Sequence, residues 1–431
     1  MTLPAEALKP YQAAVETRLA NEPDWLADLR RQALERFANK GFPSPREEEW
    51  KYTNVSPIER KRFPLAPAPG VVDEQWIEQQ RLPGCWHLVL IDGFFAPHLS
   101  HPALAGDVVF CDMGSALRRH EALLTQNLGQ AVDVEHGFID FNTALFQGGA
   151  LIRLSPGTRL EHPIQLLHVQ TQAAAIPTRH LILLEAGAEA AVIESYVGEG
   201  AGLTAHVTEI LLAENTRLQH FKIQEEARRA FHFGGLYVKQ AAGSRFEQTQ
   251  FALGSLLARS EIHLHLGEAS QCQLDGLHWA NGRRHLDSHT RILHEKPGAV
   301  SRESYKVLAE DRGRSVFQGR IVVQPGAQKT DAAMSNRNLL LSDDAEVDSK
   351  PQLEIYADDV KCAHGVTVGQ LDDNALFYLQ ARGIDADSAR QLLLYGFVNE
   401  LIETVTVAPL RQYLHRQLDN RFDAIDLEST S

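Results

Sequence analysis

A turn-like sequence recurs between residues 155 and 350 and separates short segments rich in valine, isoleucine and leucine. Successive turns begin roughly 26–30 residues apart, except the last, which begins about 18 residues after its predecessor. The turns are SPGTRLEHP, EAGAEAAVIE, AENTRLQHF, AAGSRFEQT, GEASQCQLD, KPGAVSRES, QPGAQKTDA and SDDAEVDSK, which begin at Ser155, Glu185, Ala213, Ala241, Gly267, Lys296, Gln324 and Ser342. Repeats of this period are typical of solenoids.

The segments between the turns predict short strands. HLILLEA, AAVIESYV, TEILLAE and RLQHFKI are rich in aliphatic residues and too short for helices. We therefore predict a mainly β fold whose core, residues 151–371, is a β-solenoid in which each coil buries its inner face by stacking on its neighbours. A β-sandwich and an α/β fold with unrecognised helices are the alternatives. The lack of helical periodicity between residues 150 and 370 argues against the second.

Helical patterns lie on both sides of the repeats. Residues 8–19 and 25–37 have apolar side chains at helical spacing, and Gly41 marks the end of the second segment. These helices and a Pro-rich link form a predicted N-terminal helical region, residues 1–70. A mixed α/β region follows over residues 71–150, with a strand in WHLVLIDGFFA and a helix in LRRHEALLTQNLG. Residues 372–431 predict a C-terminal α-helical domain, whose last helix opens at Pro409.

Composition excludes several functional classes. The 431-residue chain carries a formal net charge of −14, which does not favour binding to nucleic acid. No apolar run approaches the roughly 18 residues needed to span a bilayer, and the N-terminus has no apolar signal-peptide core. The four cysteines, Cys85, Cys111, Cys272 and Cys362, are widely scattered and include no CxxC pair. We therefore expect a cytoplasmic protein without a disulfide framework or a complete metal-ligand set of its own.

The common catalytic motifs are absent. The chain contains no HExxH, no GxSxG, no P-loop and no GxGxxG after a strand. Histidines are frequent in one part of the repeats, at His263, His265, His278, His285, His289 and His294. Because side chains of successive coils stack in a solenoid, we interpret these histidines as structural or surface residues rather than metal ligands.

A β-solenoid carbohydrate-active enzyme is an alternative function. Such an enzyme would need paired carboxylates along an outer groove. The candidates are Asp331, Asp343, Asp344, Asp348, Asp358 and Asp359. Enzymes of this kind are usually secreted, whereas this sequence shows no secretory signal.

The segment KCAHGVTVG, residues 361–369, offers a different chemistry. On a strand, Cys362 and His364 point to the same face, and a thiolate with an imidazole suits a transition metal. The alternative is a cysteine that packs as a small apolar side chain beside a surface histidine. The pair lies near the end of the last predicted coil, where an uncovered strand edge favours pairing with another chain. A partner subunit would then supply the missing ligands.

Several segments resemble a known family. Residues 319–384, from GRIVVQPGAQ to QARGI, closely resemble the C-terminal core of the SufB/SufD family, the scaffold subunits of the SUF iron–sulfur cluster assembly system, and SRESYKVLAEDRGRSVFQG fits upstream. REEEWKYTNVSPI, from Arg46, and KCAHGVTVG resemble the SufD branch of this family. The resemblance covers nearly the whole chain and is strongest from about residue 300 to 403.

The resemblance implies a fold, partners and a site. The fold is a right-handed parallel β-helix between N- and C-terminal helical domains. The implied function is that of a non-catalytic scaffold subunit in a complex with a SufB-type subunit and the SufC ATPase. His364 matches a histidine implicated in cluster assembly at the interface with SufB, and Cys362 matches a neighbouring cysteine. Iron or a cluster would be transient and shared with SufB, and the isolated chain would bind none stably. Without SufB, the same seam makes a homodimer possible.

The resemblance also implies that the C-terminal helical domain binds SufC. We predict the docking region in LLLYGFVNEL, with an apolar stripe of Leu392, Leu393, Phe397 and Leu401 and the acidic residues Glu400 and Glu403. Packing within the helical domain is the alternative role of this stripe. The essential SufB cysteine has no counterpart here, because the equivalent stretch SNRNLLLSDDA contains no cysteine.

Overall fold

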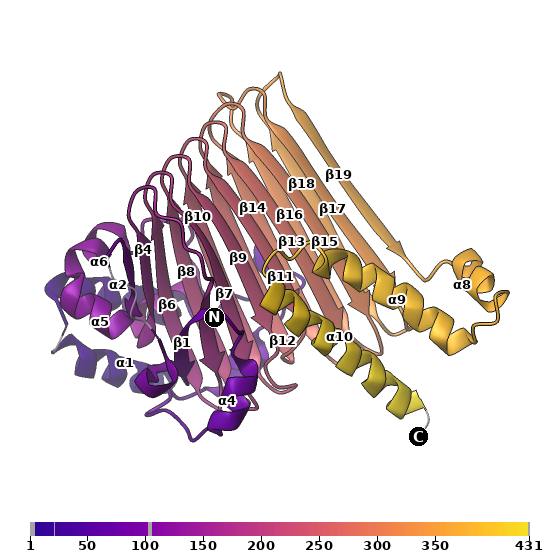
Figure 1. The fold of residues 1–431 in the computed structure, drawn as a ribbon. Coiled ribbons are helices and arrows are strands. Elements are labelled where there is room, and N and C mark those ends of the chain that lie inside the picture. The colour runs from indigo at the N-terminus through magenta and orange to yellow at the C-terminus, as the bar shows by residue number, and fades with distance from the viewer. Residues whose placement is uncertain (1–4, 21, 102–105, 430–431) are drawn as a thin grey trace.

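The computed structural model describes residues 5–20, 22–101 and 106–429, and its core is a parallel β-solenoid built from two long sheets (Figure 1). From β4 onward the chain alternates between the sheets, and each strand pairs in parallel with the strand two places along the chain. The predicted mainly β solenoid is confirmed. The sandwich and α/β alternatives are wrong, since successive strands form coils.

The two sheets contain all nineteen of the described strands. The ten-stranded sheet has the spatial order β19 (Lys361–Gly369), β17 (Asp331–Leu340), β15 (Val300–Ala309), β13 (Gln271–Ala280), β11 (Arg245–Ala252), β9 (Arg217–Gln224), β7 (Glu189–Val197), β5 (Ile164–Val169), β1 (Trp86–Ile91) and β2 (Phe94–Phe95). The nine-stranded sheet has the order β18 (Glu346–Ile355), β16 (Arg314–Val323), β14 (His285–His294), β12 (Leu257–Leu266), β10 (Phe231–Gln240), β8 (Leu203–Leu212), β6 (Ala175–Leu184), β4 (Gly148–Leu154) and β3 (Val108–Asp112).

Side chains of successive coils stack in rows along the solenoid. One inward-facing row runs from Val238 through Leu264, Ile292 and Ile321 to Leu353 without a register shift. The first four of these side chains are buried in the same apolar cluster, which Leu353 covers at the last coil. Burying an aliphatic side chain of this size contributes about 1.5–3 kcal/mol, so stacking provides the stability that a single coil lacks.

The irregular spacing of the last predicted turn has a structural reason. The first seven turns, from Ser155 to Gln324, all lead from the nine-stranded to the ten-stranded sheet. The turn at Ser342 lies between β17 and β18 and leads in the opposite direction. It therefore belongs to the other row of turns. The next member of the first row is the connection between β18 and β19, at residues 356–360.

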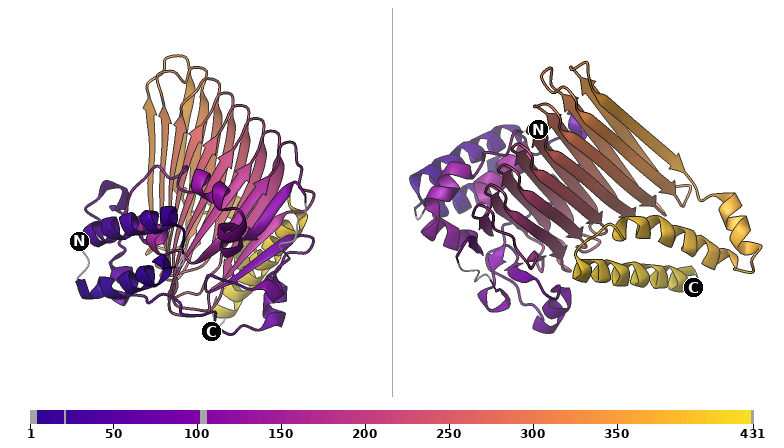
Figure 2. Two further views of the ribbon diagram at one scale, coloured as in Figure 1. Left: turned by 90° about the vertical axis from the view of Figure 1, so that its left-hand side faces the viewer. Right: turned by 45° about the horizontal axis from the view of Figure 1, so that its top comes forward.

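Helices cover the outer faces of both sheets (Figures 1 and 2). On the nine-stranded sheet lie side chains of the N-terminal helices, and the last two helices pack on the ten-stranded sheet. The helices are α1 (Ala5–Leu19), α2 (Asp24–Lys40), α3 (Ser56–Lys61), α4 (Glu74–Gln80), α5 (Met113–Arg119), α6 (Glu121–Asn127), α7 (Gly137–Leu145), α8 (Asp373–Gln380), α9 (Ala386–Ile402) and α10 (Ala408–Ser429), with short 3-10 turns at Glu48–Trp50 and Pro97–Leu99. No helix of the described residues is long and apolar enough to cross a membrane.

One predicted helix differs from the structure. The predicted helix at residues 117–129 is a pair, α5 and α6, because His120 leaves the helical conformation between them. Gly41 ends α2 as expected, with a positive φ of 67° that glycine adopts without strain. The division of the chain into four regions remains a prediction.

Part of the solenoid interior is polar. Glu194 accepts hydrogen bonds from the Thr208 hydroxyl at 2.7 Å, the His220 ring at 3.0 Å and the Tyr196 hydroxyl at 2.6 Å. All four side chains are buried. Inward-facing positions of neighbouring coils thus satisfy one another, as buried polar groups require.

Candidate functional site at the open end of the solenoid

The solenoid ends in two strands that each pair on one side only. β18 pairs with β16, and β19 pairs with β17, so both strands form the outer edges of their sheets among the described residues. Figure 1 shows the two strands at the end of the solenoid that lies away from the N-terminal helices. Their free N–H and C=O groups form a template on which another chain can pair.

This end also presents apolar side chains to solvent. Val366 and Val368 on β19 are 37% and 52% exposed, and Ile355 and Tyr356 at the end of β18 are exposed as well. The equivalent positions one coil earlier, Asn336 and Asn338, are buried. The last coil therefore exposes the type of inner surface that every other coil covers with its neighbour, and apolar exposure of this kind marks interaction sites.

Cys362 and His364 lie on β19 and face the solenoid interior. Cys362 is paired in register with Ala332, and His364 with Met334, and both partners are buried in the inner apolar cluster. Parallel neighbours in register project to the same side, so Cys362 and His364 share one face. The structure thus brings together the two predicted metal-ligating residues on the open inner face.

The two side chains differ in their surroundings. Cys362 is half-buried against the apolar cluster, and burial together with the nearby Asp331 carboxylate raises the pKa of its thiol. His364 is exposed, and its ring contacts no hydrogen-bond or ion-pair partner in the described part of the chain. Within the described residues no group of three or more His, Cys, Asp or Glu side chains is arranged to hold a metal ion. Two ligands are therefore available here, and a metal would need others from outside this chain.

The predicted docking residues on α9 lie in different environments. Leu392 is 53% exposed, and Leu393 and Phe397 are half-buried. Leu401 is buried in the apolar cluster that α9 and α10 form with the ten-stranded sheet. The buried face of α9 consists of Ala389, Leu394, Val398, Leu401 and Ile402. Leu401 therefore packs within the fold, which is the alternative role of the stripe, and the docking region stays a prediction.

The two acidic residues of this region are held by ion pairs. The Glu400 carboxylate lies 2.7 Å from Lys306 and 3.1 Å from Arg337, both of which lie on the ten-stranded sheet. Glu403 lies 3.2 Å from His415 on α10. These pairs attach α9 to the sheet and to α10.

The histidines predicted to be structural have polar partners within the chain. His278 lies inside the solenoid, 2.8 Å from the hydroxyl groups of both Ser288 and Ser315. His294 contacts Ser301 in the same way at 2.9 Å. On the outer face, His285 contacts Thr53, His289 contacts Asp287, and His263 and His265 contact Asp133. These contacts support the structural interpretation.

The carboxylates proposed for a carbohydrate-active enzyme are dispersed over β17, β18 and the turns beside them. Three of them are paired with basic side chains: Asp331 with Arg302 at 2.9 Å, Asp348 with Arg314 at 2.6 Å, and Asp359 with Lys329. Half of the candidate carboxylates are thus engaged by basic side chains rather than free along a groove.

Sequence analysis missed the exposed aromatic residues beside α9. Phe377 and Tyr378 on α8 are exposed, and Figure 1 shows α8 projecting beyond the end of the solenoid. Leu392 on α9 is a further exposed apolar side chain of the C-terminal helices. The available signal was the motif LFYL, which has more apolar residues than one buried face of a short helix can use.

Comparison with known proteins places most of the chain in one family. Residues 5–166 match the N-terminal region of SufBD proteins, and residues 167–397 match the SufBD core domain of SUF-system FeS cluster assembly. The iron–sulfur cluster assembly protein SufD of Escherichia coli is 34% identical over 90% of this chain and 92% of its own length. A SufBD family protein of Synechocystis is 30% identical over 95% of this chain and 94% of its own length.

A third relative, the chloroplastic protein ABCI7 of Arabidopsis thaliana, is 29% identical over 88% of this chain and 82% of its own length. None of these matches supports a carbohydrate-active enzyme, and the dispersed, ion-paired carboxylates do not favour one either. The family profiles, the near full-length SufD relatives and the parallel β-solenoid agree with one another. The chain belongs to the SufBD family of SUF-system iron–sulfur cluster assembly proteins.

Proposed function

We propose that the chain is a SufD-type scaffold subunit that pairs with a SufB-type subunit through the open end of its solenoid. The observation that carries this proposal is the pair of edge strands, β18 and β19, with His364 and Cys362 on the inner face of the second. A partner that adds strands to these edges also covers Val366 and Val368. The chain itself performs no catalysis in this proposal.

His364 and Cys362 would contribute ligands to iron, or to a forming cluster, that is shared across the interface. A neutral imidazole and a thiolate are both ligands for iron. The raised pKa of the Cys362 thiol disfavours the thiolate until a cation approaches, whereas the exposed His364 ring is accessible. The iron is therefore transient, and the isolated chain retains none.

The C-terminal helices would dock a SufC-type ATPase. The exposed side chains Phe377, Tyr378 and Leu392, with the half-buried Leu393 and Phe397 beside them, support this role. Glu400 and Glu403 would act indirectly, because their ion pairs hold α9 in place. In this proposal the chain is part of a cytoplasmic complex and has four regions. They are an N-terminal helical region (residues 1–70), a mixed α/β entry to the core (71–150), the β-helix core that serves as scaffold (151–371) and the C-terminal helical domain that docks the ATPase (372–431).

The test is anaerobic purification of the tagged full chain from its native cells, in the wild-type form and as His364→Ala. We expect both forms to retain a SufB-type chain and an ATPase, while the iron content of the complex falls in the variant. His98→Ala is the matched control, since His98 is an exposed histidine far along the chain from β19.

The outcomes separate the parts of the proposal. Loss of the partners from His364→Ala would make His364 a packing residue of the interface. Absence of both partners from the wild-type preparation would overturn the scaffold proposal. For the isolated chain, we expect a homodimer at high concentration, detected by sedimentation, because the same apolar end is then uncovered.

A further inference from the structure

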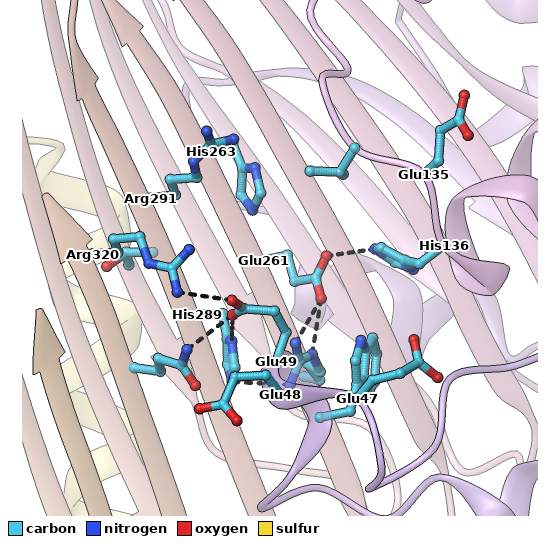
Figure 3. A pocket seen from close by; sticks show the side chains of 15 residues that line it. Glu47, Glu48, Glu49, Glu135, His136, Glu261, His263, His289, Arg291 and Arg320 are labelled. Atoms are coloured by element: carbon cyan, nitrogen blue, oxygen red, sulfur yellow. Dashed lines mark hydrogen bonds and ion pairs between the residues drawn. The ribbon is translucent and has the colours of Figure 1, made fainter. Parts of the chain in front are cut away.

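A cavity of about 340 Å³ lies on the outer face of the nine-stranded sheet and reaches β16, the strand beside the edge strand β18 (Figure 3). Two N-terminal segments, residues 47–50 and 134–136, cover strands β12, β14 and β16 and enclose it. The volume lies within the range of small-molecule sites, roughly 300–1,000 Å³.

The floor of the cavity is a row of basic side chains. His263, Arg291 and Arg320 occupy the same register position on β12, β14 and β16, so they follow one another at the strand spacing of about 4.8 Å. Each retains at least one N–H group or ring nitrogen without a partner in the described chain: Nε2 of His263, Nε and Nη2 of Arg291, and Nη1 of Arg320. Asp133 accepts hydrogen bonds from His263 and Arg291 at one end of the row, and Glu49 and Gln352 accept them from Arg320 at the other, where Glu354 lies 3.5 Å from Nε of Arg320.

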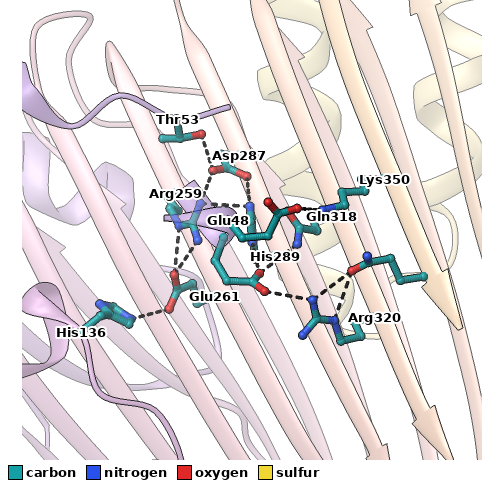
Figure 4. Close-up of polar contacts among 12 residues, drawn as sticks. Glu48, Thr53, His136, Arg259, Glu261, Asp287, His289, Gln318, Arg320 and Lys350 are labelled. Carbon is teal, nitrogen blue, oxygen red and sulfur yellow. Dashed lines mark hydrogen bonds and ion pairs between the residues drawn. The ribbon is translucent and has the colours of Figure 1, made fainter. Parts of the chain in front are cut away.

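Buried ion pairs hold this floor rigid (Figure 4). Arg259, whose side chain is 1% exposed, binds Glu261 at 2.8 Å and Asp287 at 2.7 Å. Its guanidinium lies 3.6 Å from the ring centre of Trp50, which belongs to the covering segment. Arg259 offsets one of these two negative charges, and the rings of His136 and His289 also contact Glu261 and Asp287. The free nitrogens of the row are the groups available to a ligand.

The rim of the cavity is acidic. Glu47 and Glu135 belong to the two covering segments, and Figure 3 shows both carboxylates beside the cavity. Glu135 has only a long ion pair, 3.6 Å, with Lys40. The acidic rim repels a ligand that carries only a negative charge. Arg291 and Arg320 at the floor repel a ligand that carries only a positive charge.

We propose that this cavity binds a small zwitterion, with its anionic group on Arg291 and Arg320 and its cationic group at the rim, near Glu47 and Glu135. A guanidinium pair binds a carboxylate through charge-assisted hydrogen bonds, and a carboxylate rim binds an ammonium group in the same way. The ligand class is therefore a short ω-amino acid or a similar molecule. This inference does not rest on the proposed role in cluster assembly.

The test is isothermal titration of the full chain with matched probes. 4-Aminobutanoate and 6-aminohexanoate carry both charges, butanoate and hexanoate only the negative one, and butylammonium and hexylammonium only the positive one. We expect at least one zwitterion to bind about tenfold more tightly than both single-charge analogues of its length.

Two variants assign the binding to this cavity. Arg291→Gln should weaken zwitterion binding about tenfold, and Glu135→Gln should remove most of the preference over the plain anion. Arg302→Gln is the control, because Arg302 is an ion-paired arginine on β15 of the other sheet. If Arg291→Gln lowers the melting temperature, its weaker binding is not specific to the cavity, and Glu135→Gln then assigns the binding. Glu135 has no close partner among the described residues, so its replacement should leave the fold intact.

Three results would overturn the proposal. Equal affinity for butanoate and 4-aminobutanoate would show a plain anion site, and failure of both zwitterions to bind at millimolar concentration would show that the cavity selects neither. Unchanged affinity in both variants would place any binding elsewhere.

Discussion

Nδ1 of His232 lies 2.7 Å from Oε2 of Glu226 inside the solenoid, where neither side chain is more than 1% exposed. Burial lowers the pKa of the His232 ring, and although burial also opposes the charge on Glu226, His232 and Thr204 hold the pKa of that carboxyl below its usual value. A carboxylate only accepts hydrogen bonds, so Nδ1–H donates and the opposite nitrogen accepts from His206, 3.2 Å away.

Removal of the carboxylate should destabilise the whole solenoid. Glu226→Ala leaves Nδ1–H of His232 and the Thr204 hydroxyl without their acceptor, while Gln224 keeps its bond to Ser255, and each buried group left unpaired costs about 1–3 kcal/mol. We expect a clearly lower midpoint of urea unfolding followed by circular dichroism. Glu268→Ala, in an exposed turn, should stay within about 0.5 kcal/mol of the wild type. Equal stability of the two variants would contradict the importance of the buried network.

Two glycine substitutions should differ because of their surroundings. A Cβ atom on Gly234 would lie 2.2 Å from the His206 ring and 2.4 Å from Nζ of Lys222, inside the solenoid. Gly234→Ala should therefore destabilise the protein by about 1–3 kcal/mol. Gly365→Ala, on the edge strand β19, meets nothing within 4 Å and should be neutral or slightly stabilising. Thermal melting of both variants checks this difference. A similar loss of stability in both would show that the side chains around Gly234 move aside for the added methyl group.

The contact of Asp133 with His265 should make stability depend on pH. The hydrogen bonds with Asp133 and Glu295 raise the pKa of His265 in the folded protein. A raised pKa contributes stability that is fully present below the unfolded value of about 6.5 and is lost as the pH rises through the folded pKa. We expect the melting temperature to fall from pH 6 to pH 8.5 by more in the wild type than in His265→Gln.

The comparison between the two proteins isolates His265. His289, whose pKa is also raised, titrates in both forms, and His263 and Arg291 contact Asp133 in both. Parallel pH profiles for the wild type and the variant would show that His265 contributes nothing to this dependence.

Charged substitutions at the open end should prevent association. Val366→Asp and Val368→Asp place a carboxylate on the apolar inner face of β19, where a partner strand would bury it at a large cost. We expect the double variant to remain folded but to lose its SufB-type partner in a pull-down and any self-association in sedimentation. Val71→Asp is the control, since Val71 is 98% exposed outside this end. Loss of the partner from the control as well would point to a general effect of charge.

The repeat of turns was sufficient to predict the solenoid. Residues such as Val238, Leu264 and Ile292 recur at one position of each coil, and a strand-sized segment with this period can bury its inner face only against the next coil. The position of Cys362 and His364 on one face followed from the alternation of side chains along a strand. Local pattern determines both features, so neither required the tertiary structure.

The local sequence pattern could not predict which face of α9 is buried. The run Leu392, Leu393 and Leu394 offers neighbouring apolar stripes, and hydrophobic periodicity does not distinguish between them. The structure buries Leu394 and exposes Leu392, because the ion pairs of Glu400 with Lys306 and Arg337 attach α9 to the ten-stranded sheet.

The sequence by itself therefore determined the architecture, the family resemblance and the face shared by Cys362 and His364, because these depend on periodicity and on local motifs. Tertiary structure alone decided which side chains meet from distant parts of the chain. Glu49 reaches Arg320, and Trp50 reaches Arg259, only because an N-terminal segment crosses the outer face of the nine-stranded sheet. No spacing within the sequence encodes that crossing, since it depends on how one folded element packs on another.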